Sequence, residues 1–209
     1  MFIDLSRSAG FLSRLCTLPV VIKQVYEAKL FRLLCRALAT NIGILTGSGN
    51  SKAYEEKSWV VEERTNLIRI LSSEGGAPSE KCKEIASEEK LVLAIIHLFP
   101  RPREELGEIT PLSVTLPPAS APPALLLGNA ARCLMSYADD AEYTSLLYNK
   151  SPANGLERLI CAMATCSDIR VRKNIAILLA KGCKFPGVKE RVSHFRGLEM
   201  IVELQNKFS

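Results

Sequence analysis

GLERLICAM, which begins at Gly155, and GLEMIVELQ, which begins at Gly197, are two copies of one helical unit that lie 42 residues apart. Each copy opens with Gly-Leu-Glu and places two apolar residues three and four positions after the leucine. These residues are Leu159 and Ile160 in the first copy, and Ile201 and Val202 in the second. Residues with this spacing share one face of an α-helix, so each copy is predicted to bury that face.

Two further helices are predicted between the copies. Residues 169–182 (IRVRKNIAILLAKG) are apolar with a helical period, and residues 187–195 (GVKERVSHF) form a short amphipathic segment. A period of about 42 residues that combines one short helix with two longer ones is typical of helical repeats that stack into a solenoid. The stretch 155–207 therefore predicts an all-α repeat fold.

The same spacing of apolar residues recurs upstream. Residues 20–39 are strongly helical and carry apolar residues at 0, +3, +4 and +7, namely Leu30, Leu33, Leu34 and Ala37. Residues 91–99 repeat this series with Leu91, Ala94, Ile95 and Leu98. We expect both sets to face the core.

An asparagine marks the long third helix of each predicted repeat. These asparagines are Asn66, Asn129 and Asn174. The next second helix starts 24, 26 and 23 residues later, at Lys90, Gly155 and Gly197 respectively. The regular interval extends the repeat pattern over most of the chain.

Two repeats carry extra residues between their second and third helices. One insertion, residues 41–50, is rich in Gly, Ser and Asn, and the other, residues 100–123, contains seven prolines. Stacked repeats tolerate insertions in one loop type, because such loops project from an edge and leave the shared core intact. Neither segment has a core-facing period, so both are expected to be mobile surface loops that proteases cut first.

The order of one short and two longer helices resembles the armadillo repeat family over nearly the whole chain, with the two-helix HEAT repeat as the nearest alternative. The resemblance implies an all-α, right-handed armadillo-like α-solenoid (an ARM/HEAT superhelix) that forms one domain over residues 1–209. The expected repeats span approximately residues 18–74, 78–138, 139–183 and 185–209. The last of them lacks a third helix and is expected to act as a C-terminal cap.

Residues 1–15 are interpreted as the remnant of a preceding repeat. A lone third helix leaves its apolar face partly uncovered, because a solenoid needs capping repeats at its ends. We therefore expect this chain to be the C-terminal part of a longer protein, or a second chain to cover Phe2, Leu5 and Leu12.

The end of the chain carries a more specific resemblance. The segments RKNIAILLAKGC and VSHFRGLEMIVELQ resemble the final repeat of an armadillo tail that follows a tetratricopeptide domain in a family of axonemal dynein-arm assembly factors. This resemblance implies a part in the assembly of a larger complex such as the dynein arms.

The motifs argue against an enzyme. Of the two histidines, His97 lies in an apolar helical stretch, where a structural role is expected, and His194 lies among charged residues. No zinc-protease, nucleotide-binding or serine-hydrolase motif is present. Cys161 and Cys166 have no third and fourth metal ligand nearby. We predict a non-enzymatic protein with no catalytic residue, no metal site and no cofactor.

The cysteines and the lengths of the apolar runs indicate where in the cell the protein is expected. The seven cysteines are scattered and include no C-x-x-C motif, so all are expected to be reduced. The longest apolar runs, such as residues 91–96, are too short to span a bilayer. We expect a cytoplasmic protein with no membrane partner.

In armadillo proteins the third helices line a concave groove, so the resemblance implies that the third helices form the binding surface here. The stripe of each third helix that is not expected to face the core carries an asparagine and a cation. These residues are Asn66 with Arg69, Asn129 with Arg132, and Asn174 with Lys181. Amides can hold an extended backbone while cations select acidic side chains, although the asparagines could instead bond within the solenoid. The predicted partner is an acidic extended segment of another protein, or a helical chaperone or assembly client.

A basic surface in the last repeat provides the alternative function. The net charge is +5, and between residues 168 and 196 eight Lys or Arg stand against two acidic residues. The predicted patch consists of Arg170, Arg172, Lys173, Lys184, Lys189 and Arg191. Such a patch attracts phosphates, so nucleic-acid binding is the second hypothesis, with a solvated helix face as the structural explanation.

Overall fold

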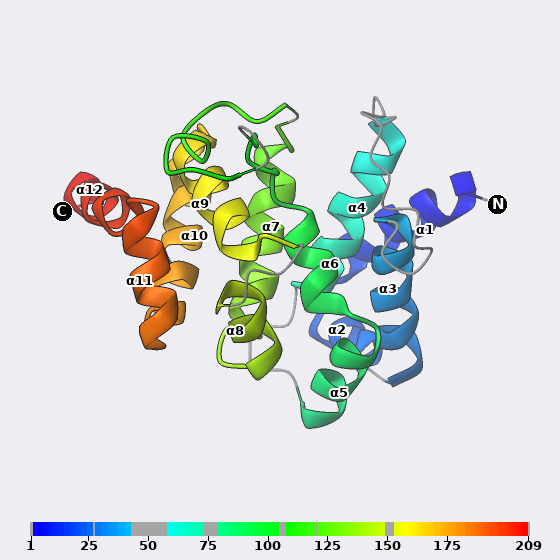
Figure 1. The fold of residues 1–209 in the computed structure, drawn as a ribbon. Coiled ribbons are helices and arrows are strands. Elements are labelled where there is room, and N and C mark those ends of the chain that lie inside the picture. The colour runs from blue at the N-terminus through cyan, green and yellow to red at the C-terminus, as the bar shows by residue number, and fades with distance from the viewer. Residues whose placement is uncertain are drawn as a thin grey trace. The chain divides into compact units, whose positions relative to one another are not determined.

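The computed structural model describes residues 2–26, 28–42, 58–72, 79–104, 108–119, 121–148 and 153–208. These residues form twelve α-helices and no strand, so the predicted all-α fold is confirmed (Figure 1). The helices are α1 (Phe2–Leu15), α2 (Pro19–Val25), α3 (Ala28–Asn41), α4 (Ser58–Leu71), α5 (Glu80–Glu88), α6 (Leu91–His97), α7 (Ala124–Met135), α8 (Ala141–Tyr148), α9 (Gly155–Thr165), α10 (Ile169–Gly182), α11 (Pro186–His194) and α12 (Gly197–Phe208).

The chain consists of two compact units, unit 1 (Met1–Ile95) and unit 2 (Ile96–Ser209). The boundary falls within α6. The single domain over residues 1–209, the repeat boundaries and the right-handed superhelix stay predictions.

In unit 1, α4 packs against α1 and α3, and α3 also contacts α2 and α5. The buried face of α3 consists of Phe31, Leu34, Cys35 and Leu38. Polar contacts join the helices at two points. Ser13 Oγ donates to Asn66 Oδ1 over 3.2 Å, between α1 and α4, and Tyr26 OH donates to the carbonyl oxygen of Leu71 over 2.8 Å.

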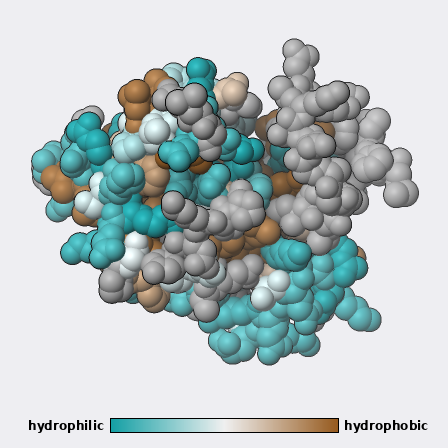
Figure 2. All heavy atoms as spheres, viewed as in Figure 1, coloured by the Kyte–Doolittle hydropathy of each residue, from teal (hydrophilic) through white to brown (hydrophobic). Residues whose placement is uncertain are grey.

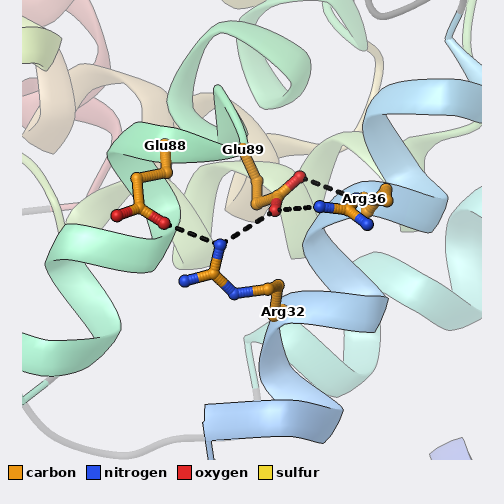
Figure 3. A network of polar contacts seen from close by, with 4 residues as sticks. All are labelled: Arg32, Arg36, Glu88 and Glu89. Carbon is orange, nitrogen blue, oxygen red and sulfur yellow. Dashed lines mark hydrogen bonds and ion pairs between the residues drawn. The ribbon is translucent and has the colours of Figure 1, made fainter.

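A network of charges ties α3 to the end of α5 (Figure 3). Glu89 is buried, and its two carboxylate oxygens accept hydrogen bonds from Arg36 Nε over 3.1 Å and Nη2 over 2.8 Å. Arg32 Nη1 lies 3.3 Å from Glu89 Oε1 and 2.6 Å from Oε2 of the exposed Glu88. The hydrogen bonds from Arg36, with the charges of both arginines, lower the pKa of Glu89. The carboxylate therefore stays charged inside unit 1, while the outer surface of α5 is hydrophilic (Figure 2).

In unit 2, helices pack in three pairs whose members correspond in the predicted repeat (Figure 1). The third helices α7 and α10, the first helices α8 and α11, and the second helices α9 and α12 each contact one another. α10 also contacts α9 within its own predicted repeat. Leu134, Leu156, Ile160 and Leu178 are among the fully buried residues of this core.

The corner before a second helix is built in the same way three times. A residue with a left-handed backbone precedes the helix each time: Lys90 before α6 (φ 54°), Asn154 before α9 (φ 47°) and Arg196 before α12 (φ 60°). Its carbonyl oxygen accepts a hydrogen bond from the amide four residues later, at Ala94, Arg158 and Met200 respectively. Because non-glycine residues adopt this backbone conformation at a cost, its recurrence marks equivalent turns.

The glycine that opens each Gly-Leu-Glu unit allows a first and a second helix to approach closely. A Cβ on Gly155 would lie 2.8 Å from the carbonyl oxygen of Leu146 in α8. A Cβ on Gly197 would lie 2.8 Å from Val192 Cγ1 and 3.1 Å from the carbonyl oxygen of Val192 in α11. A side chain at either glycine would therefore push the paired helices apart.

Several expectations about individual positions need correction. Residues 20–39 form two helices, because α2 ends at Val25 and α3 begins at Ala28. Leu33 is 60% exposed, since the buried face of α3 starts one residue later than predicted, at Phe31. Val202 is 55% exposed, because no helix among the described residues covers it, whereas its counterpart Ile160 lies against the start of α12. The predicted face of α6 is confirmed, with Leu91, Ala94, Ile95 and Leu98 all buried.

The proline-rich segment is irregular but anchored. Its described residues, 100–104, 108–119 and 121–123, contain no helix, as its prolines predict. The sequence shows no core-facing period in this segment, but two of its residues, Ser113 and Val114, are fully buried. Ser113 Oγ accepts a hydrogen bond from the Thr110 amide over 3.0 Å and lies 2.9 Å from the Thr110 hydroxyl. Of the other insertion, residues 43–50 lie outside the described residues.

Candidate functional site

The third helices of unit 2 pack side by side, and all of their charged residues are basic. α7 contains one cation and α10 contains four, and neither helix contains an aspartate or glutamate. The five cations, which define the α7–α10 surface, are Arg132, Arg170, Arg172, Lys173 and Lys181. A surface of this composition attracts negatively charged groups.

Close packing positions α10 on α7. Gly128 of α7 leaves room for Val171 of α10, whose Cγ2 would lie 3.3 Å from a Cβ at position 128. Leu178 and Leu179 are fully buried on the inner face of α10. Asp168 caps the start of α10 by accepting a hydrogen bond from the amide of Arg170 over 2.8 Å.

Asn66 and Arg69, two of the predicted groove residues, lie in unit 1. Asn66 is half-buried against α1, where it accepts the hydrogen bond from Ser13 and where its Nδ2 would lie 3.5 Å from a Cβ on Gly10. Arg69 is exposed. The Asn66 amide therefore joins two helices of unit 1.

The other four predicted groove residues lie in unit 2. Asn129 is only 1% exposed, and its Oδ1 accepts a hydrogen bond from Arg132, one turn further along α7. Asn129 Nδ2 is buried and has no hydrogen-bond partner among the described residues. On α10, Asn174 is half-buried and Lys181 Nζ lies 3.6 Å from Asp139. The structure thus places Arg132 at the surface and keeps the Asn129 amide inside.

The predicted basic patch is divided among several partners. Arg170 pairs with Asp168 at 3.2 Å and Lys184 with Asp139 at 3.3 Å. Arg191 forms an ion pair with the buried Glu157 of α9, and Arg172 Nε donates to the carbonyl oxygen of Met163 over 2.8 Å. Lys173 and Lys189 are exposed. Four of the six cations therefore bond to acidic or carbonyl groups within unit 2, which sequence reasoning did not predict.

A buried arginine joins two segments of unit 2. Arg158 is 9% exposed and donates Nη1 to the carbonyl oxygen of Phe99 over 2.6 Å and Nε to that of Ala153 over 2.8 Å. Burial lowers the pKa of Arg158 to about 10, so it stays charged at neutral pH. Burial, with the charges of Arg158 and Arg101, lowers the pKa of His97 to about 4, so that histidine stays neutral. The two hydrogen bonds of Arg158 link α9 to Phe99, just after α6, and to Ala153, just before α9.

A groove of about 320 Å³ lies between α10 and α12, and we call it the α10–α12 groove. Lys173, Ala176, Ile177 and Ala180 line it from one face of α10. Ile201, Leu204 and Gln205 line it from α12. The lining is mostly apolar, and Lys173 is its one charged member among the described residues.

Comparison of the chain with protein-family models, curated proteins and solved structures finds no match. The armadillo resemblance and the likeness to dynein-arm assembly factors therefore stay proposals. Among the described residues, no helix is both long and apolar enough to cross a membrane.

Sequence reasoning missed the α10–α12 groove, although the sequence contains a signal for it. When Asn129 is aligned with Asn174, the exposed Arg132 of α7 corresponds to Ile177 of α10. An isoleucine at a position that carries a cation one repeat earlier indicates a surface that another molecule could cover.

Proposed function

We propose that this chain is a non-enzymatic protein-binding scaffold built from armadillo-like repeats. Two features of the fold support the repeat architecture: the pairing of corresponding helices in unit 2, and the three matching corners before α6, α9 and α12. Stacked helical repeats present continuous surfaces made of equivalent helices, and such surfaces suit the binding of other proteins.

The observation that carries the proposal is the charge of the α7–α10 surface, which has five cations and no acidic residue in its two helices. An acidic, extended segment of a partner would gain charge-assisted hydrogen bonds there, and repulsion between like charges would disfavour a basic segment. Given the resemblance of the last repeat, we further propose that the scaffold acts in the cytoplasm in the assembly of a larger complex such as the axonemal dynein arms.

The test is capture of partners from a cell lysate by the full chain, with and without nuclease. Arg132→Glu reverses an exposed charge on the α7–α10 surface, and Lys189→Glu makes the same change on α11, outside that surface. We expect a protein partner that survives nuclease, is lost with Arg132→Glu and is kept with Lys189→Glu. Equal capture by all three proteins would rule out this surface as the binding site.

Nucleic-acid binding through the basic patch is the competing function. Four of the six patch cations, Arg170, Arg172, Lys184 and Arg191, bond to acidic or carbonyl groups of unit 2, so phosphates would have to compete with these groups for them. A partner that nuclease removes, together with an affinity for a DNA or RNA oligonucleotide that falls steeply with salt, would support the nucleic-acid hypothesis instead.

A further inference from the structure

The α10–α12 groove has a more fully covered counterpart one repeat earlier. Its wall on α10 corresponds to Gly128, Ala131, Arg132 and Met135 of α7, and its wall on α12 corresponds to Leu159, Ala162 and Met163 of α9. On α7 only Ala131 is fully buried and Arg132 is exposed, but the three residues of α9 are all 0% exposed. In the groove itself, Ile177 is 40% exposed and Ile201 is half-buried. The two equivalent pairs of helices thus differ mainly in whether the second helix, α9 or α12, is covered.

A helix covers the counterpart. α10 packs against both α7 and α9, with Val171 next to Gly128 and with Arg172 donating a hydrogen bond to the carbonyl oxygen of Met163. The face that α10 uses is apolar with helical spacing, and it buries Val171, Ile175, Leu178 and Leu179. The groove between α10 and α12 therefore has the shape that fits the apolar face of an α-helix.

We propose that the α10–α12 groove is a docking site for an amphipathic, acidic α-helix of a partner protein. The helix would lie on α10 and α12 as α10 lies on α7 and α9, with apolar residues at i, i+3, i+4 and i+7 in the groove. The proposal rests on the proposed scaffold function and names a second type of segment that the scaffold binds.

Charge selects an acidic helix over a basic one. Lys173 lines the groove and α10 contains no acidic residue, while Arg170, one turn before Lys173, pairs with Asp168 at the start of the helix. Acidic side chains along the edge of the docked helix would therefore face positive charge, whereas a basic helix would be repelled.

The probe is a fluorescently labelled peptide that covers residues 168–182 and carries Arg170→Glu, Arg172→Glu, Lys173→Glu and Lys181→Glu. It keeps the apolar face of α10 and reverses the charges of its four cations. The same peptide without substitutions tests the charge preference. Binding of both peptides to the full chain is measured by fluorescence anisotropy, and binding of the acidic peptide should also increase its helical circular dichroism.

We expect saturable binding of the acidic peptide and weaker binding of the basic one. Ile177→Glu should weaken acidic-peptide binding roughly tenfold or more, because it places an unpaired carboxylate in an apolar groove. Val202→Glu is the matched control, because Val202 is an exposed branched residue of α12 that does not line the groove. Lys173→Glu should weaken the acidic peptide about two- to five-fold, the effect of an exposed charge pair, and strengthen the basic one.

Three outcomes would overturn the proposal: no saturable binding of the acidic peptide, equal loss with Ile177→Glu and Val202→Glu, or preference for the basic peptide. A dimer that light scattering detects and Ile177→Glu dissociates would also overturn it, because the occupant would then be a second copy of the chain. If peptide binding fails while capture from lysate still depends on Arg132, only the docking site is wrong. If peptide binding depends on Ile177 while capture does not depend on Arg132, only the α7–α10 surface is wrong.

Discussion

Glu89 is a single residue whose charge state controls part of the stability of unit 1. Its side chain is 6% exposed and accepts hydrogen bonds from Arg32 and Arg36, and those from Arg36 above all lower its pKa. A carboxyl group with a lower pKa in the folded state stabilises the protein above its unfolded pKa, and this contribution is lost as the pH falls through the folded value.

We therefore expect Glu89→Gln to lower the free energy of unfolding at neutral pH by roughly 1–3 kcal/mol, the range for a hydrogen bond to a charged group. The difference from the wild-type chain should shrink in acid, below the ordinary glutamate pKa of about 4.3. Urea denaturation over a pH series measures both effects. Glu88→Gln is the control, because the Glu88 side chain is 58% exposed and its pair with Arg32 should contribute little. Equal losses for the two variants would contradict this account.

The asparagines show what sequence reasoning could and could not predict for single residues. Their repeat positions were predicted from spacing, and the alternative that they bond within the fold describes Asn66, which accepts a hydrogen bond from Ser13. The burial of Asn129 could not be predicted, because it depends on how closely α7 and α10 approach at Gly128 and Val171. These residues are far apart in the sequence, and a helical period does not show which partner helix covers a given face.

Among the helices, the corners between first and second helices should tolerate change least. Gly155→Ala would place a Cβ 2.8 Å from a backbone oxygen of α8, and the backbone cannot move aside as a flexible side chain can. We expect a loss of roughly 1–3 kcal/mol in the free energy of unfolding, as for other overpacked sites.

Gly10→Ala is the matched change at an uncrowded site. A Cβ on Gly10 would lie 3.5 Å from Asn66 Nδ2, an ordinary contact, so this variant should be neutral or more stable by about 0.5–1 kcal/mol through better helix propensity. Thermal unfolding of both variants measures the difference. If Gly155→Ala were as stable as the wild-type chain, the close approach of α8 and α9 would be wrong.

Helix positions were largely predictable, because strong local signals mark them. Pro19 and Asp168 stand at helix starts, and the apolar period defines α6 and α10. The break between α2 and α3 was missed, because no glycine or proline marks it in the sequence. The exposure of Val202 was missed for another reason: a repeat copy predicts a buried face, but burial requires a further helix to cover it.

At the scale of the whole molecule, corresponding helices of unit 2 pack on one another, and we propose that the resulting surfaces bind other proteins. Most of the positive charge near the end of the chain is used inside the fold. Of the eight cations between residues 168 and 196, six bond to acidic or carbonyl groups of unit 2, and several, such as Lys173 and Lys189, are exposed. The same segment therefore contributes both to stability and to the surface available for partners.

The pairing of α7 with α10 is the central claim, because both proposed binding surfaces depend on it. The most direct test is disulfide cross-linking in the full chain that carries Gly128→Cys and Val171→Cys, with Gly128→Cys and Lys189→Cys as the control pair. Val171 Cγ2 would lie 3.3 Å from a Cβ at position 128, so mild oxidation should join the first pair. Peptide mass spectrometry should find the cross-link between residues 128 and 171 and no comparable link in the control. Failure of the first pair to cross-link above the control would contradict the stacking of third helices.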